Sequence, residues 1–224
     1  MGRLKPHYFA GIFALLASLL SGQAEHPLAP TITFTCDFPG SDPAHYTISV
    51  SSDGRASYTS DGKLTRDSDP SEPFNLDFTM PQTTLTRIFD MAKKAHYFEG
   101  ELDSKRKNIA STGEKTLAYK DAQRNTSASY NYSPVPVVQE ITTVFQNLAI
   151  TLEFGRRLEF DHRYQKLALN EELDRMSDAS SRNELADVTV IAPTLRKIVE
   201  DPSVVNTARM HAQRLLDRAG AAGK

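Results

Sequence analysis

The chain has 224 residues, of which 39% are hydrophobic and 24% are charged, and its formal net charge is −2. This composition is typical of a globular protein with a packed core, and it excludes the fibrous and wholly disordered classes. Neither half of the chain is basic, which excludes an electrostatic surface for nucleic acid or anionic lipid.

Residues 1–24 have the pattern of a cleavable bacterial export signal. Arg3 and Lys5 precede an apolar run at 9–20, and the small residues of 22–24 lie where a signal peptidase cuts. This run is shorter than the roughly 20 residues that a permanent membrane span needs, although an uncleaved anchor is the alternative. We expect cleavage after Ala24, export to the periplasm or the medium, and no stable membrane insertion afterwards. Cleavage would leave a mature chain with a formal charge of −4.

Alternation of apolar residues with period two predicts the strands of the first half. They lie at 31–36, 45–51, 55–60, 74–80, 114–120 and 124–132, with Asp53-Gly54 as the turn of a hairpin. Apolar residues at helical spacing predict one helix at 82–95, directly after Pro81. The residues 61–73, rich in Asp, Ser and Pro, predict a loop.

The second half has helical periodicity. A stripe from Val138 to Leu152 continues toward Leu167, and Asn170 has the character of a cap for a new helix. Pro193 should split the stripe at 185–199. Asp201-Pro202 predicts the start of a last helix that ends at Gly220.

Together these elements predict an α+β protein with an antiparallel sheet of about five strands, one inserted helix and an α-helical C-terminal region. The expected organisation is a signal peptide at 1–24, a β-sheet domain with one helix at 25–134, and a helical region at 135–224. The helical region packs on the sheet domain or extends from it.

Three segments resemble an uncharacterised family of bacterial exported domains of unknown function. They are YTISVSSDGRASY at 46–58, FTMPQTTLTRIFDMAKKAHYF at 78–98 and TLAYKD at 116–121. In that family a hairpin with a small-residue turn precedes a helix that ends in an aromatic pair, here Tyr97-Phe98. The family's Gly-Cys segment between the first two strands is matched only in part by residues 36–40. The resemblance covers about 31–150 and implies a fold, with no activity attached.

No motif for a known catalytic, nucleotide-binding or zinc site occurs in the chain. We considered His162 as a catalytic or metal-binding residue, a cation loop at Asp67, Asp69 and Glu72, and a nucleophile turn at 111–113. A surface or loop role is favoured for each, because none has partners at the required spacing. The sequence therefore indicates no catalytic, cofactor-binding or metal-ligating residue.

Cys36 is the single cysteine, so an intrachain disulfide is excluded. Its place in an alternating strand favours a small buried side chain over a reactive thiol. The basic run 105–107 predicts a solvated loop. The basic residues Arg156, Arg157, Arg163 and Lys166 alternate with acids, including Glu159 four residues before Arg163, and this predicts a solvated helix face.

The leading functional hypothesis is a non-enzymatic exported module that binds another envelope or extracellular protein. It rests on strong structural patterning without convergent reactive groups, and it includes no cofactor and no nucleic acid. One alternative is an envelope hydrolase whose site assembles from loops around 100–113 and His162; convergence of His162, His96 and a hydroxyl or carboxylate in a cleft would favour it. The other is a helical adaptor carried on a β platform.

Overall fold

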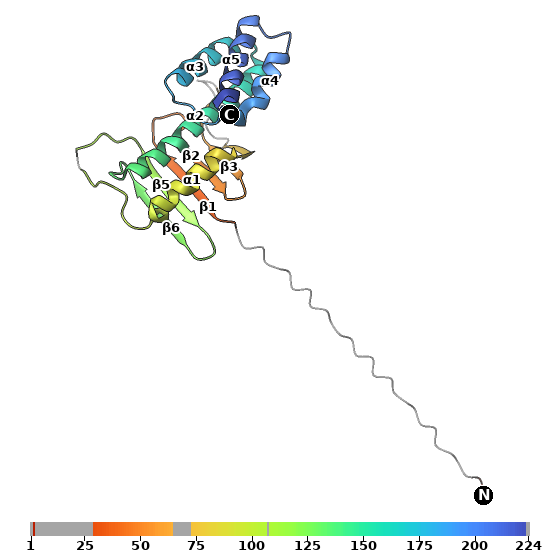
Figure 1. Cartoon of the computed structure of the whole chain (residues 1–224). Coiled ribbons are helices and arrows are strands. Elements are labelled where there is room, and N and C mark those ends of the chain that lie inside the picture. Colours follow the sequence, from red (N-terminus) through yellow and green to blue (C-terminus); the bar gives the residue numbers. More distant parts are fainter. Residues whose placement is uncertain (1, 3–28, 65–72, 107, 223–224) are drawn as a thin grey trace.

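A computed structural model describes residues 2, 29–64, 73–106 and 108–222. It confirms the α+β class, with an antiparallel sheet of six strands where about five were expected, followed by helices (Figure 1). The predicted signal segment 1–24, apart from Gly2, and the acidic residues Asp67, Asp69 and Glu72 lie outside the described residues.

The sheet has the strand order β4-β3-β2-β1-β5-β6, and every neighbouring pair is antiparallel. Its strands are β1 (Thr31–Asp37), β2 (His45–Ser51), β3 (Arg55–Ser60), β4 (Phe74–Thr79), β5 (Glu114–Lys120) and β6 (Asn125–Tyr130). The first strand lies inside the sheet because it pairs with β2 on one side and with β5 on the other. Gly54, with φ +88°, allows the tight β2–β3 turn that Asp53-Gly54 predicts.

One face of the sheet is covered by two helices, α1 (Gln82–Lys94) and α2 (Pro136–Tyr164). The apolar residues of each strand point to this face and form the main core, with Phe34 stacked on Phe145 of α2 at 5.2 Å between ring centroids. The short 3₁₀ helix η1 (His96–Phe98) follows α1, and Phe98 is fully buried in the same core. This burial stabilises the sheet by removing its apolar face from water.

The long helix α2 belongs to two cores. Its first part, including Val138 and Leu152, packs on the sheet. Its last part, including Phe154 and Leu158, packs with α3 (Leu169–Ser181), η2 (Val188–Ile191), α4 (Ala192–Glu200) and α5 (Asn206–Ala222). In Figure 1 the same helix runs from the sheet into the helical group. The two parts of the protein therefore share one rigid element.

Several helix ends differ from the sequence predictions. Helix α3 begins where expected, but Asn170 does not cap it, since its Oδ1 atom is buried without a hydrogen-bond partner among the described residues. Pro193 does split its stripe, because it lies in the first turn of α4. Helix α5 begins at Asn206 and not at Pro202, and it continues past Gly220.

The late start of α5 has a local cause. Asp201 accepts a hydrogen bond from the Ser203 backbone N–H at Oδ1, 2.9 Å, and the Val204 N–H donates to the Asp201 carbonyl at 3.1 Å. These bonds form a closed turn in place of a helix start. Gly220 does not end α5, since glycine interrupts a helix only weakly when no left-handed turn follows. Within the described ranges, no helix combines the length and the apolar character that a membrane span requires.

Candidate functional site

The face of the sheet opposite the helices is polar at every position of its three central rows except Ala118. Register and alternation place its side chains in rows that cross all six strands. The first row is Asn75, Thr59, Thr47, Thr35, Thr116 and Ser129. The second row is Asp77, Ser57, Ser49, Thr33, Ala118 and Ser127. In the third row Thr79 pairs with Arg55, and Ser51, Thr31, Lys120 and Asn125 follow across the hairpin turn. We call these three rows the hydroxyl face.

Hydroxyl groups on this face bond to one another across the strands. The Thr33 and Ser49 oxygens are 2.9 Å apart, and those of Thr116 and Ser129 are 2.7 Å apart. Such pairs hold the side chains in place and leave each hydroxyl with further bonding capacity, because a hydroxyl can donate one bond and accept two. The face is therefore an ordered array of donors and acceptors.

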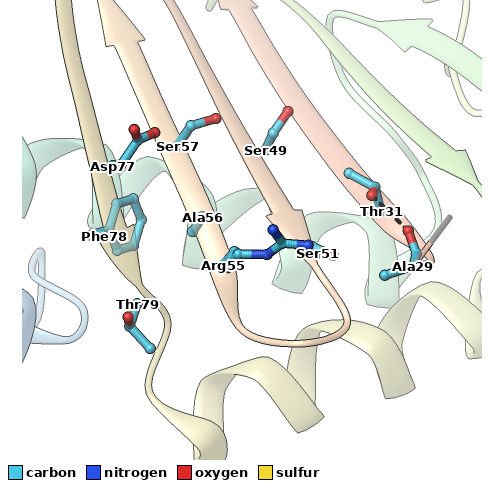
Figure 2. Close-up of a pocket in the computed structure, with 10 residues that line it drawn as sticks. All are labelled: Ala29, Thr31, Ser49, Ser51, Arg55, Ala56, Ser57, Asp77, Phe78 and Thr79. Carbon is cyan, nitrogen blue, oxygen red and sulfur yellow. Dashed lines mark hydrogen bonds between the residues drawn. The ribbon is translucent and has the colours of Figure 1, made fainter. Parts of the chain in front are cut away.

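Part of the hydroxyl face is hollowed at the β2–β3 turn into an open depression of about 660 Å³ (Figure 2). Figure 2 shows Arg55 lying beside Ser51, with Ser49, Ser57 and Asp77 farther along the same side of the sheet. The Arg55 Nε–H donates to Asp53 Oδ2 at 2.8 Å, and this bond is the main cause that lowers the pKa of the Asp53 carboxyl.

Charge is nearly balanced over the three rows. Their charged residues are Arg55, Lys120 and Asp77, and Arg55 is paired with Asp53 of the turn. None of the eighteen positions carries an aromatic residue, and Ala118 is the single apolar one. The three rows offer hydrogen bonds without a charge preference, and the apolar side chains that line the depression beside them are Ala29, Ala56 and Phe78.

A second hollow, of about 550 Å³, lies between α2 and the β1–β2 connection. Its lining includes Cys36, Phe38, Tyr46 and Ile150. Cys36 is 4% exposed, which confirms the predicted buried strand position, and its burial raises the pKa of the thiol. A protonated, shielded thiol is a poor nucleophile.

A buried ionic network, anchored by Glu153 of α2, joins the sheet to the helical part. Tyr58 and Ser60 of β3 donate to Glu153 Oε1 at 2.8 and 2.5 Å. The other oxygen, Oε2, lies 3.6 Å from the Arg156 guanidinium, and Arg157 donates to Glu172 of α3 at 2.5 Å. The side chain of Glu153 is 4% exposed, and it borders the hollow of about 550 Å³ between α2 and the β1–β2 connection.

This network corrects the sequence prediction for the basic residues of α2. Arg156 and Arg157 are largely buried ion-pair partners and not part of a solvated face, whereas Arg163 is exposed as expected. Glu159 pairs with Lys197 of α4 at 3.8 Å and not with Arg163. One signal could have revealed the network: Glu153 is an acid inside the apolar run LAITLEF at 148–154.

His162 belongs to a surface cluster that ties α2 to the turn between α4 and α5. Its Nε2 lies 2.9 Å from Asp201 Oδ2, to which the Lys166 ammonium also donates at 2.6 Å. Ser203 Oγ donates to Asp201 Oδ1 and accepts from Lys166, each at 2.6 Å. No local sequence pattern indicates the contact of Ser203 with Lys166, because the two residues are 37 positions apart.

This cluster contains the residue types of a catalytic site, but its hydrogen bonds do not connect the Ser203 hydroxyl to a base. Lys166, followed by Ser203, holds the pKa of the Asp201 carboxyl far below its usual range, so Asp201 is an anion at neutral pH. The Lys166 amine donates to Asp201 and to the Ser203 hydroxyl, so in this arrangement it is a donor to Ser203 and not an acceptor of its proton. His162 contacts Asp201 and not the Ser203 hydroxyl. The arrangement is that of an ion-paired clamp.

The remaining candidate groups lie in separate surroundings. His96 is exposed on η1. Thr112 is held by Asn131 Oδ1, which accepts from its backbone N–H at 2.9 Å, and by Lys115, which donates to its hydroxyl at 2.8 Å. The predicted hydrolase site at 100–113 therefore has no base supplied by either histidine in the described contacts. Among all residues that the structure describes, no three His, Cys, Asp or Glu side chains lie close enough together to hold a metal ion.

Comparison with known proteins gave no match. No protein-family model matches the chain, and no curated protein matches it. The resemblance of residues 31–150 to exported domains of unknown function thus stays a prediction.

Proposed function

We propose that the mature protein, exported after cleavage near Ala24, is a non-enzymatic binding module whose hydroxyl face holds an uncharged glycan strand. The observation that carries this proposal is the polar array across six strands, interrupted only by Ala118 among the eighteen positions of the three rows, on the side of the sheet opposite α1 and α2.

The chemistry of the array favours a glycan over a protein on this surface. Hot spots of protein–protein interfaces are enriched in Trp, Tyr and Arg seated in desolvated pockets. The three rows contain no aromatic residue, and Arg55 is 84% exposed at their margin. A glycan, in contrast, presents repeated hydroxyl and amide groups that match serine and threonine donors and acceptors one by one. This differs from the protein partner that the sequence led us to expect.

Binding by such an array should depend on the length of the ligand. Each hydrogen bond exchanged with water contributes a net of only about 0.5–1.5 kcal/mol. Neighbouring strands are about 4.8 Å apart, so a longer polymer contacts more strands than a short one. A weak but length-dependent affinity follows.

The test uses the mature chain, residues 25–224, and oligomers of N-acetylglucosamine of increasing length, measured by titration calorimetry. We expect affinity to rise with length and to fall at least tenfold in Ser49→Lys, because Ser49 is central in the second row. Ser181→Lys on the exposed end of α3 is the matched control and should bind as the parent does.

Two results would contradict the proposal. One is equal binding by the parent and Ser49→Lys, or no binding of any oligomer. The other is turnover of the oligomer that one point substitution abolishes, which would favour an envelope hydrolase.

A further inference from the structure

We infer that two copies of this protein pair through β4, so that their sheets join edge to edge. This inference concerns the edge of the sheet and does not depend on the ligand of the hydroxyl face.

Among the residues that the structure describes, no strand pairs with the outer side of β4. The Met80 N–H donates to the Gly54 carbonyl at 2.9 Å, at the β3 end of this strand pair. Since successive residues of a strand direct their backbone groups to opposite sides, those of Asn75, Asp77 and Thr79 point away from β3. Within the described ranges, β4 is the last strand of the sheet at this side. Such a row of outward-pointing N–H and C=O groups is a template for another strand.

The apolar side chains of β4 are less covered than those of the opposite edge strand. Phe74 and Phe78 are partly exposed although they point to the core side of the sheet. On β6, Ala128 and Tyr130 are buried, and the Tyr130 hydroxyl is bonded to Thr142 of α2. The β4 edge therefore has apolar surface left to bury.

β4 also lacks several devices that keep edges apart. Its six residues contain no lysine and no proline, and they pair with β3 in continuous register without a bulge. Pro73 precedes the strand, and the one charged residue of β4, Asp77, lies on the hydroxyl face. Natural edge strands commonly use inward-pointing charges, bulges or lysines to prevent pairing.

The strand is complementary to itself when two copies run antiparallel about Leu76. Leu76 then lies opposite Leu76 of the second copy, and Phe74 lies opposite Phe78, all on the core side. On the other side the Asn75 amide faces the Asp77 carboxylate, so a donor meets an anion and like charges do not face each other. The same register makes Asn75 and Asp77 a pair that exchanges both backbone hydrogen bonds.

This pairing would continue the rows of the hydroxyl face from one copy into the next. Asn75 ends the first row and Asp77 ends the second, and in the dimer each is followed by the other from the second copy. A polymer too long for one sheet would then meet a second array in direct continuation.

Disulfide trapping tests the register in the mature chain carrying Cys36→Ala. Leu76 forms a pair without backbone hydrogen bonds, with Cα atoms about 4.5 Å apart, which suits a disulfide. We expect Leu76→Cys to give a covalent dimer on mild oxidation in high yield. Asn75→Cys, whose opposite residue is Asp77, should give at least fivefold less dimer.

A second measurement does not need cysteine. The mass of the parent chain, measured by light scattering after gel filtration, should rise toward that of a dimer with concentration. Asp77→Pro removes an N–H that points out of the sheet and should give a monomer with an unchanged circular dichroism spectrum. Equal trapping of the two cysteine variants, or a parent that stays monomeric at high concentration, would overturn the inference.

Discussion

Tyr58 of β3 donates a hydrogen bond of 2.8 Å to Glu153 of α2, across 95 residues of sequence, and this contact connects the sheet to the helix that both cores share. Ser60 donates to the same oxygen. On the other side Arg156 donates to the Gly62 carbonyl at 2.7 Å and lies over the Phe74 ring. The end of β3 and the edge strand β4 are thus held to the middle of α2.

Removal of Glu153 should destabilise the protein more than removal of one partner of an exposed ion pair. Glu153→Ala leaves buried Arg156 and Arg157 with one partner fewer, and we expect a loss of about 3–5 kcal/mol in the free energy of unfolding. Tyr58→Phe removes one bond to a charged acceptor and should cost about 1.5–3 kcal/mol. Urea denaturation measures both.

The control lies on the same helix. Glu140 forms a 2.7 Å ion pair with Arg87, with both side chains about half exposed, so Glu140→Ala should change stability by less than about 1 kcal/mol. A larger effect at Glu140 than at Glu153 would contradict the role given to the buried network.

Asp161 should make stability fall as pH rises through mildly acidic values. Burial, and after it the Glu172 carboxylate, raise the pKa of Asp161 to about 6 in the folded protein. The unfolded chain has a pKa of about 3.9, so between about pH 4 and pH 6 the folded state holds a proton that the unfolded state has released. The proton stabilises the fold below this window, and that stabilisation is lost above it.

Asp161→Asn keeps the shape of the side chain and removes the charge. We expect it to raise the free energy of unfolding at pH 7 by about 1–3 kcal/mol and to flatten the profile between about pH 4 and pH 6. Asp90→Asn, at an exposed position of α1, is the control and should leave the profile unchanged. A profile for Asp161→Asn that is parallel to the parent would refute the assignment.

Gly155 should be required for the contact of α2 with η2. A Cβ atom at Gly155 would overlap Ile191 Cγ2 and lie 3.2 Å from Ile191 Cβ, so Ile191 of η2 would have to shift. We expect Gly155→Ala to lower stability by about 1–3 kcal/mol. The double variant Gly155→Ala, Ile191→Ala should show a non-additive loss, since the second change removes the clash.

Gly220 provides the opposite case. Nothing lies within 4 Å of a Cβ built there, and the residue is inside α5. Gly220→Ala should therefore stabilise the protein by up to about 1 kcal/mol through helix propensity. Thermal melts of the two alanine variants should move in opposite directions.

Cys36 should react with thiol reagents only when the protein opens. Its side chain is buried in the β1 strand, and burial raises its pKa. We expect alkylation of the native protein to be at least 100-fold slower than that of the urea-unfolded chain. Equal rates in the two states would show an accessible, reactive thiol.

Much of the fold follows from local patterns. Alternation at 31–36, 45–51 and 114–120 fixes which residues face the core, and the same alternation places Thr33 and Ser49 on the outer face. What local patterns do not contain is strand order. Only when β1 pairs with both β2 and β5 do the threonines and serines of separate strands form continuous rows.

Glu153, an acid in an apolar run, is the local sign of the interior ionic groups, but their partners are not contained in local patterns. Arg156 and Arg157 look solvated when only their own helix is considered, because Arg156 also bonds to Gly62 in the loop after β3 and Arg157 to Glu172 of α3. The start of α5 differs from the prediction because Asp201 closes a turn with Ser203 and Val204, while its second carboxylate oxygen is bonded to His162 and Lys166.

The most direct test of the proposed function is a nuclear magnetic resonance titration of the mature chain with a long N-acetylglucosamine oligomer. We expect the largest amide shift changes in β1, β2 and β3, at residues of the hydroxyl face such as Thr33, Ser49 and Ser57, with α3 to α5 unaffected. Shift changes confined to the helical part, or absent at saturating oligomer, would contradict a glycan-binding role for this face.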